Sequence, residues 1–283
     1  MRTLLPIAAL VLAIFAIGEF TFGAARNTHE DKSKDHSISA QQLLKKVVDN
    51  ELAADKNDNY LWKYTSVTGK AGENTSEEVV ETRHGILTMK LVENGKRLSK
   101  DEEREQREHI RDLVSHPDEA MKAQQDQSQD ADKAEVMLRL LPQALLAEYG
   151  AKRGGLQGLD FRPNPNFHPS SHEAEVFQAM SGTIWVDTKE DRLEEIDGRL
   201  SHTVEFGWGG VLGHLDKGGR FHVVQKEVAP SHWEIVRLFV DMSGKALFFK
   251  SISVHQDETR SDYKLLPPNM TLADGAKLLN GRT

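Results

Sequence analysis

The sequence predicts an α+β protein built on one curved antiparallel sheet, with helices on the concave face of that sheet. Two observations predict this class. Strand-like runs fill the second half of the chain and follow one another at intervals of about ten residues with short turns, which is typical of an antiparallel meander. Helical patterns are confined to 40–54, 99–148 and a short C-terminal segment. The order of helix, strands, helices and many strands indicates an α+β plan whose sheet is large enough to curl.

Composition excludes several classes of protein. The chain has 283 residues, of which 28% are charged, and a formal net charge of −8. This charged fraction is near that of globular proteins, which argues against a wholly disordered chain. The absence of cysteine excludes a disulfide scaffold, an iron–sulfur cluster, a thiol nucleophile and a lipidated N-terminal cysteine. The negative charge argues against a nucleic-acid partner.

The N-terminus has the pattern of an export signal. Arg2 precedes an uncharged apolar run from Leu4 to Ile17, and the small residues Gly23-Ala24-Ala25 follow. We therefore expect a signal peptide over 1–25 and a periplasmic location. The apolar run of about 14 residues is shorter than the ~20 that a membrane-spanning helix needs. An uncleaved segment that retains the protein at the inner membrane remains the alternative.

We expect a flexible leader over 26–38 and a single folded domain over 39–283. The domain starts with Ser39 and Gln42, which have the spacing of a capping box. Apolar residues then recur at helical spacing, which predicts an amphipathic helix from about 40 to 54.

Strands follow this helix. Residues 60–67 carry aromatics at alternate positions, which is typical of a strand. Further strand-like runs cover 78–83 and 85–92, and Asn94-Gly95 predicts a tight turn.

A helical insert is expected at about 99–148. Ser99 and Glu102 form a second capping box. The pattern predicts two or three helices, and Pro142 should kink or restart the last one. The charged stretch 101–111 is interpreted as a solvated helix face.

The second half of the chain reads as a series of strands. Ser243-Gly244 is predicted to join the last two of these strands as a hairpin. Asp197-Gly198 fits either a hairpin turn or the inside of a long strand. Pro267-Pro268 should end the sheet, and 271–279 should form a short helix. The predicted strands cover 182–187, 200–206, 221–228, 233–242 and 246–254.

No pattern of catalytic or metal-binding chemistry stands out. The histidines are scattered, and the chain lacks the HExxH and Gly-x-Ser-x-Gly patterns. We therefore expect no enzymatic activity, no cofactor and no metal. The glycine-rich segment 207–213 lies between strands, so it is interpreted as a strand connection rather than a phosphate-binding loop.

Aromatic residues in or beside the predicted strands are the candidate ligand-binding residues. If the sheet curls, its concave face offers an apolar hollow, and the mouths of barrel-like sheets are common ligand sites. For any single residue, ordinary core packing is the alternative. The candidates are Trp62, Trp185, Phe206, Trp208, Phe221, Trp233, Phe239 and Phe248.

Several of these segments resemble a known family. The carrying motifs are Gly182-Thr183-Ile184-Trp185-Val186-Asp187, Val204-Glu205-Phe206-Gly207 and Ala246-Leu247-Phe248-Phe249-Lys250. They resemble exported proteins similar to the outer-membrane lipoprotein-sorting group, whose LolA-like fold also occurs in periplasmic sensors of the RseB type. The resemblance covers about 40–265. It implies an unclosed β-barrel whose concave side is plugged by helices, and a non-enzymatic carrier or sensor that holds acyl chains.

The functional expectation is a cell-envelope protein that binds a lipid or a lipoprotein acyl chain in the hollow of its sheet. The alternative is an RseB-like sensor or interaction protein, in which the insert at 99–148 docks an envelope protein partner. A third hypothesis is an envelope hydrolase that uses scattered His and Asp residues.

Overall fold

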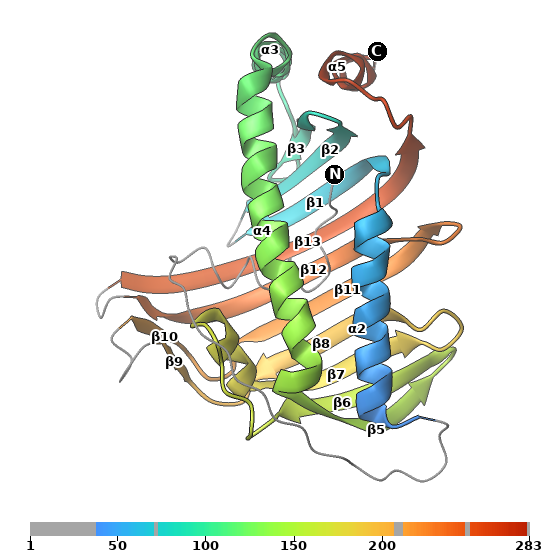
Figure 1. Cartoon of the computed structure of the whole chain (residues 1–283). Helices are drawn as coiled ribbons and strands as arrows, with labels where there is room; N and C mark the ends of the chain where they lie inside the picture. The colour runs from blue at the N-terminus through green and yellow to red at the C-terminus, as the bar shows by residue number, and fades with distance from the viewer. Residues whose placement is uncertain (1–37, 71–72, 207–211, 247–249, 282–283) are drawn as a thin grey trace.

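The computed structural model confirms an α+β protein with a large, unclosed antiparallel sheet (Figure 1). The structure describes residues 38–70, 73–206, 212–246 and 250–281. Eleven strands form one continuous path in the order β4-β3-β2-β1-β13-β12-β11-β8-β7-β6-β5. The short strands β9 and β10 lie off this path, where β10 pairs with β12.

The elements have the following bounds. The helices are α2 (Ala40–Asn57), α3 (Lys100–Ser115), α4 (Pro117–Ala144) and α5 (Leu272–Asn280), with a 3-10 helix η1 (Glu173–Gln178). The first strands are β1 (Leu61–Lys70), β2 (Glu73–Thr82), β3 (Gly85–Glu93), β4 (Lys96–Arg97), β5 (Leu145–Arg153), β6 (Leu156–Pro163) and β7 (Met180–Asp187). The remaining strands are β8 (Arg192–Leu200), β9 (Val204–Phe206), β10 (Gly213–Leu215), β11 (Arg220–Ala229), β12 (His232–Ala246) and β13 (Lys250–Leu266).

The first strand of the chain and the last lie side by side in the middle of the sheet (Figure 1). β1 pairs antiparallel with β13 from Leu61↔Leu266 to Gly69↔Asp257. β1 also pairs with β2, and β13 with β12. The sheet therefore consists of two runs of neighbouring strands that are joined through the β1–β13 pair.

Helices α2 and α4 cover the concave face of the sheet (Figure 1). Ser39 accepts a hydrogen bond from the Gln42 amide, and the Gln42 side chain accepts one from the Ser39 amide, so the predicted capping box starts α2. Leu44 of α2 and Leu138 of α4 are each 1% exposed and belong to the largest apolar core. This core fills the space between the two helices and strands β5 to β8, β11 and β12.

A second core lies on the other face of β2 and β3. Val80 and Leu87 pack there against Ile110 of α3, Ala120 near the start of α4, and Leu279 of α5. Their neighbours Val79 and Ile86 belong to a third cluster around Trp62. Since side chains alternate across a strand, β2 and β3 contribute apolar side chains to clusters on both faces of the sheet.

Several predicted features are confirmed. The capping box at Ser99 and Glu102 starts α3. Asn94 and Gly95 have φ angles of 52° and 75° and form the tight turn between β3 and β4. β13 ends just before Pro267, and the short C-terminal helix is α5. Of the two alternatives left open for Asp197-Gly198, the structure shows the inside of a strand, β8.

Other predicted boundaries are wrong. Ser243 and Gly244 do not turn; they lie inside β12 and pair with Ser253 and Ile252 of β13. The strand expected over 200–206 is divided, because β8 ends at Leu200 and β9 starts at Val204.

The helical insert ends earlier than expected. Pro142 lies inside α4, which continues to Ala144 without a restart, and residues 145–148 belong to β5. Leu141 and Leu145 are both buried, so the apolar spacing of the helix runs into the first position of the strand. The apolar spacing therefore gave no signal for the start of β5.

Some predictions lie outside the described residues. These are the signal peptide over 1–25, the leader as far as residue 37, and the residues Trp208 and Phe248. Within the described part of the chain, no helix combines the length and the apolar character needed to cross a membrane.

Candidate functional site

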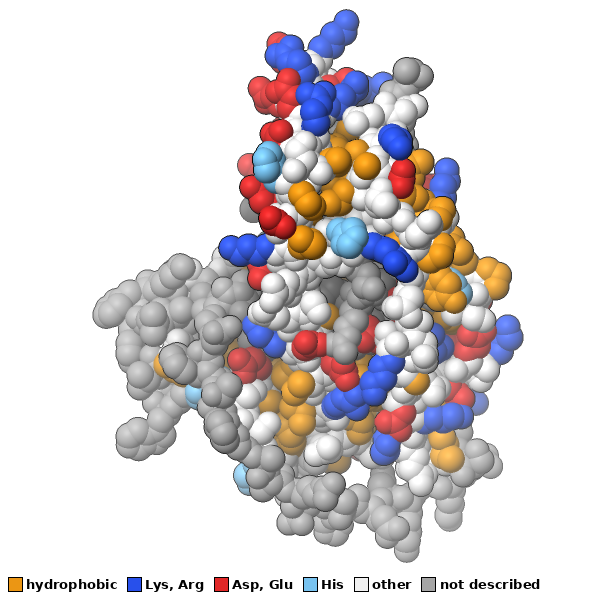
Figure 2. Space-filling view, turned by 45° about the horizontal axis from the view of Figure 1, so that its top comes forward, with side chains coloured by type: hydrophobic (Ala, Val, Ile, Leu, Met, Phe, Trp, Pro, Cys, Tyr) orange, Lys and Arg blue, Asp and Glu red, His pale blue; other side chains and the backbone are white. Residues whose placement is uncertain are grey.

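Two adjoining hollows lie on the concave side of the sheet. The first has a volume of about 280 Å³ and lies between the C-terminal end of α2 and the β11–β12 turn. The second, of about 270 Å³, extends over β1, β2 and β13 to Gln127 of α4. Glu234 and Ile235 of β12 line both. Figure 2 shows charged side chains of both signs around a hollowed region of this face.

Aromatic rings form one wall of the first hollow. Trp62 is 1% exposed and lies in β1, where alternation turns its indole to the same face as Tyr64. His232 lies 4.0 Å from the Tyr60 ring and 5.8 Å from the Trp62 ring, centroid to centroid. Trp233, the residue after His232 in β12, also lines this hollow.

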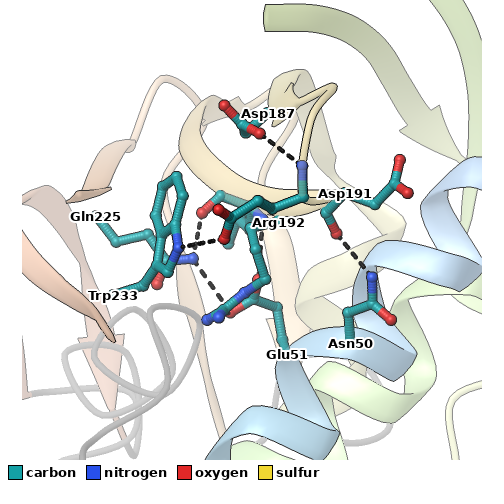
Figure 3. A network of polar contacts seen from close by, with 9 residues as sticks. Asn50, Glu51, Asp187, Asp191, Arg192, Gln225 and Trp233 are labelled. Carbon is teal, nitrogen blue, oxygen red and sulfur yellow. Dashed lines mark hydrogen bonds and ion pairs between the residues drawn. The ribbon is translucent and has the colours of Figure 1, made fainter. Parts of the chain in front are cut away.

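A network of polar contacts forms another wall (Figure 3). Glu51 of α2 is 2% exposed, and Arg192 of β8 donates two hydrogen bonds to it, at 2.7 and 3.1 Å. The Leu193 amide and the Gln225 side chain also donate to Glu51, at 2.9 and 3.1 Å. The Trp233 indole donates to Glu190 at 3.2 Å. The network joins α2, β8, β11 and β12 at one point.

The second hollow is lined by a half-buried arginine, Arg260, and its partners. Arg260 donates to Glu258 at 2.6 Å, and Ser66 donates to the same carboxylate at 3.0 Å. The guanidinium of Arg260 lies 5.4 Å from the Tyr64 ring, which stacks on Tyr263 at 5.0 Å. Burial opposes the ionisation of Glu258, but Arg260 and these hydrogen bonds hold its pKa below the ordinary value.

Two further carboxyl groups line the hollows: Glu234 lines both of them, and Glu81 lines the second. Burial raises the pKa of Glu81 to about 7, although the Trp62 amide donates to its carboxylate at 3.0 Å. Burial raises the pKa of Glu234 well above its ordinary value, and the neighbouring Glu81 and Asp58 raise it further. Glu81 can therefore exchange protons near neutral pH, and both carboxyl groups can receive a cation.

The structure brings together only some of the predicted ligand-binding residues. Trp62 and Trp233 line the first hollow. Phe221 is fully buried in the largest core, and Phe206 packs at the edge of that core.

Trp185 and Phe239 alternate with core residues of β7 and β12, so they lie on the opposite face of the sheet. There Arg153 lies 4.3 Å from the Trp185 ring, and His255 lies 6.0 Å from the Phe239 ring. Trp208 and Phe248 belong to the part of the chain that is not described.

Sequence reasoning missed the charged residues of the hollows. Glu81 shares its strand face with Val79, Arg260 shares its face with Glu258, and Glu234 follows Trp233 directly. Alternation with Val79 was an available signal for Glu81, because it places both side chains on one face of the strand. Glu234 and Arg260 offered no such signal, since Glu234 is adjacent to Trp233 and Arg260 alternates with another charged residue. Among the described residues, no three His, Asp or Glu side chains are grouped so as to hold a metal ion.

The protein thus has an unclosed antiparallel sheet with an apolar core and two hollows lined by polar and aromatic side chains. No protein-family model, curated protein or solved structure matches this chain.

Proposed function

We propose that this chain is a non-enzymatic, exported binding protein that holds an amphipathic molecule with an apolar chain in the hollows of its sheet. The observation that carries the proposal is the pair of adjoining hollows that share Glu234 and Ile235. Each hollow combines apolar or aromatic side chains with buried charged groups. Concave sites with apolar walls and a few fixed polar groups are typical of small-molecule binding.

The apolar walls can supply affinity for a chain without any reaction. Trp62, Trp233 and Ile235 line the first hollow, and Val79, Ile86 and Ile235 line the second. Each Å² of apolar surface removed from water contributes about 25 cal/mol, so a single alkyl chain in contact with these side chains gains several kcal/mol. A lipid or a lipoprotein acyl chain is a ligand of this kind, and the LolA-like resemblance supports the same class.

Tryptophan fluorescence tests the proposal, because two of the four tryptophans line the first hollow. Titration with decan-1-ol, a neutral molecule with a single alkyl chain, should shift the emission and saturate. Trp62→Phe should reduce the signal, and Trp185→Phe, on the other face of the sheet, should leave the shift in place. Failure of the alcohol and of longer fatty acids to bind, together with a protein that native mass spectrometry shows to be ligand-free, would overturn it.

A partner-docking role is the second candidate, and exposed apolar residues on α4 favour it. Met121 is 41% exposed and Val136 is 57% exposed, although the rest of the outer face of α4 is polar. Met121→Asp and Val136→Asp should abolish capture of an envelope protein in this case and leave decan-1-ol binding unchanged. Equal capture by both variants and the native chain would contradict the docking role.

A further inference from the structure

Glu234 is a buried carboxyl group that faces both hollows. It is 8% exposed and lies in the wall that the two hollows share. The indole N–H of Trp62 comes near enough to lower the pKa of Glu234 slightly, but the indole nitrogen is outside hydrogen-bond geometry. Glu234 has no ion-pair partner among the described residues. A buried carboxylate without a countercharge is costly, because burial removes the water that stabilises its charge.

The charges around Glu234 are mainly negative. Glu81 and Asp58 lie close enough to act on Glu234 as like charges. The two arginines that line the hollows are already engaged. Arg260 is paired with Glu258 at 2.6 Å, and Arg192 is paired with Glu51 at 2.7 Å. Arg260 attracts Glu234 and offsets part of the repulsion from Glu81 and Asp58, but it forms no ion pair with Glu234, so the charge of this carboxylate is only partly balanced.

Aromatic rings complete the surroundings of this charge. Tyr60, Trp62, His232 and Trp233 line the same hollow as Glu234 and Asp58. The face of an aromatic ring carries negative potential and attracts cations within about 6 Å of its centre. Carboxylates and ring faces in one hollow favour an organic cation and disfavour an anion.

We propose that the hollow around Glu234 binds the ammonium group of an amphipathic ligand, whose apolar chain lies along Trp62, Trp233 and Ile235. This inference rests on the proposed function and names the polar end of its ligand. The ammonium group would lie between Glu234 and the aromatic wall, where Asp58 and Glu81 add to its attraction.

Binding of such a ligand is coupled to protons. Burial raises the pKa of Glu81 to about 7, so this carboxyl group is mostly protonated below that pH. Burial also raises the pKa of Glu234. A bound cation favours the ionised carboxylates, so binding releases protons and strengthens as pH rises through about 7. The other titratable or charged groups that line the two hollows are Glu51, Asp55 and Asp58 of α2 and its end, Tyr60 and Tyr64 of β1, Glu77 of β2, Arg192 of β8, His232 of β12, and Glu258, Arg260 and Tyr263 of β13.

Three ligands with the same alkyl chain separate the two proposals. Decylamine, decan-1-ol and decanoate are titrated into the full chain by calorimetry, each below its micellar concentration. At about pH 8, where Glu81 is ionised, decylamine should bind at least ~10-fold more tightly than decan-1-ol, and decanoate should bind least. Calorimetry in two buffers of different ionisation enthalpy should show proton release when decylamine binds.

Substitution identifies the site. Glu234→Gln should weaken decylamine binding by ~10-fold and leave decan-1-ol binding nearly unchanged. Glu105→Gln removes one charge from exposed α3 and is the matched control, with no expected change. Glu81→Gln, which keeps the hollow intact, should reduce proton release.

Each outcome decides one proposal or both. Equal affinities for the amine and the alcohol, or tighter binding of decanoate, would overturn the ammonium site and leave the binding function standing. Decylamine binding that is insensitive to Glu234→Gln and Glu81→Gln, and that releases no protons, would also overturn the site. Absence of binding by all three ligands would overturn both proposals.

Discussion

Glu51 shows how a single buried charge can hold several elements in place. Its carboxylate accepts hydrogen bonds from Arg192, the Leu193 amide and Gln225, so donors from β8 and β11 meet a residue of α2. The side chains of Arg192 and Glu51 are 14% and 3% exposed. Removing one partner from a buried pair leaves the other charge without compensation, which is more costly than losing an exposed pair.

Arg192→Met should therefore lower the free energy of unfolding by about 3–5 kcal/mol. Lys45→Met is the control, because Lys45 and its partner Asp49 are 66% and 58% exposed, and it should change stability by less than about 1 kcal/mol. Urea denaturation of the three proteins measures both effects. A loss for Arg192→Met no larger than that of the control would show that the network does not stabilise the fold.

Glu81 makes stability depend on pH with a defined sign. The ordinary pKa of its carboxyl group is 4.5, and the pKa is about 7 in the folded protein, because burial favours the neutral acid. Between these two values the folded state holds a proton that the unfolded state has released. The contribution of Glu81 to stability is therefore full below 4.5 and falls by about 3 kcal/mol as pH rises through 7.

Glu81→Gln should remove this part of the pH dependence. Relative to the native chain, the variant should gain stability from about pH 5 to about pH 8, by up to about 3 kcal/mol. Urea midpoints at the two pH values, with Glu105→Gln as the exposed control, measure the change. Parallel stability curves for the native chain and Glu81→Gln would contradict the raised pKa.

At the scale of the elements, Gly198 is required where β8 meets β11. It pairs with Phe221 of β11 and with Gly182 of β7. A Cβ atom at Gly198 would lie 2.2 Å from the Phe221 ring, which is fully buried. The ring thus occupies the space that a side chain at position 198 would need.

Gly198→Ala should destabilise the protein by about 3 kcal/mol, because it overpacks a filled core. Gly155→Ala is the control, since a Cβ atom there meets nothing within 4 Å, and it should change stability by less than about 0.5 kcal/mol. Thermal unfolding of both variants compares the two losses. A similar small change in each would mean that the core around Phe221 can relax.

The elements differ in how far the sequence could predict them. Helix α2 and the tight turn at Asn94-Gly95 follow from local signals, namely a capping box and a residue pair suited to positive φ angles. The end of α4 could not be predicted in this way, because Leu141 and Leu145 fit one helical stripe while Leu145 already belongs to β5. Ser243-Gly244 resembles a turn locally, but its pairing partners in β13 decide its structure.

The candidate site was only partly predictable for a related reason. Alternation within a strand shows which residues share a face but not which face is concave, so Trp62 and Trp185 looked equivalent. They lie on opposite faces of the sheet. Glu234 and Glu81 were missed because a carboxylate in a strand is normally exposed. Their burial depends on α2, α4 and distant strands, which no local pattern contains.

At the scale of the whole molecule, the three apolar clusters are connected. β2 contributes Val80 to one cluster and Val79 to another, and α4 contributes to both the largest core and the one on the other face. Calorimetry should therefore show one unfolding transition, with a calorimetric enthalpy equal to the van't Hoff enthalpy. Two resolved transitions would indicate that the region around α3 and α5 unfolds separately.

The same connectivity affects how partner docking can be tested. Removing residues 99–148 would also remove Ala134, Leu138 and Leu141 of α4, which are buried in the largest core. Such a deletion would remove part of the largest core. A loss of partner capture would then not distinguish unfolding of the protein from loss of the docking surface. Substitutions at exposed Met121 and Val136 avoid this problem.

The pairing of β1 with β13 has a consequence for biosynthesis. The hydrogen bond from Ser66 to Glu258 joins residues 192 positions apart, and contacts of such long range slow folding. While the ribosome is still making β13, β1 lacks one of its two neighbours and the two runs of strands have no link. The nascent chain therefore stays incompletely folded until synthesis of this region is finished.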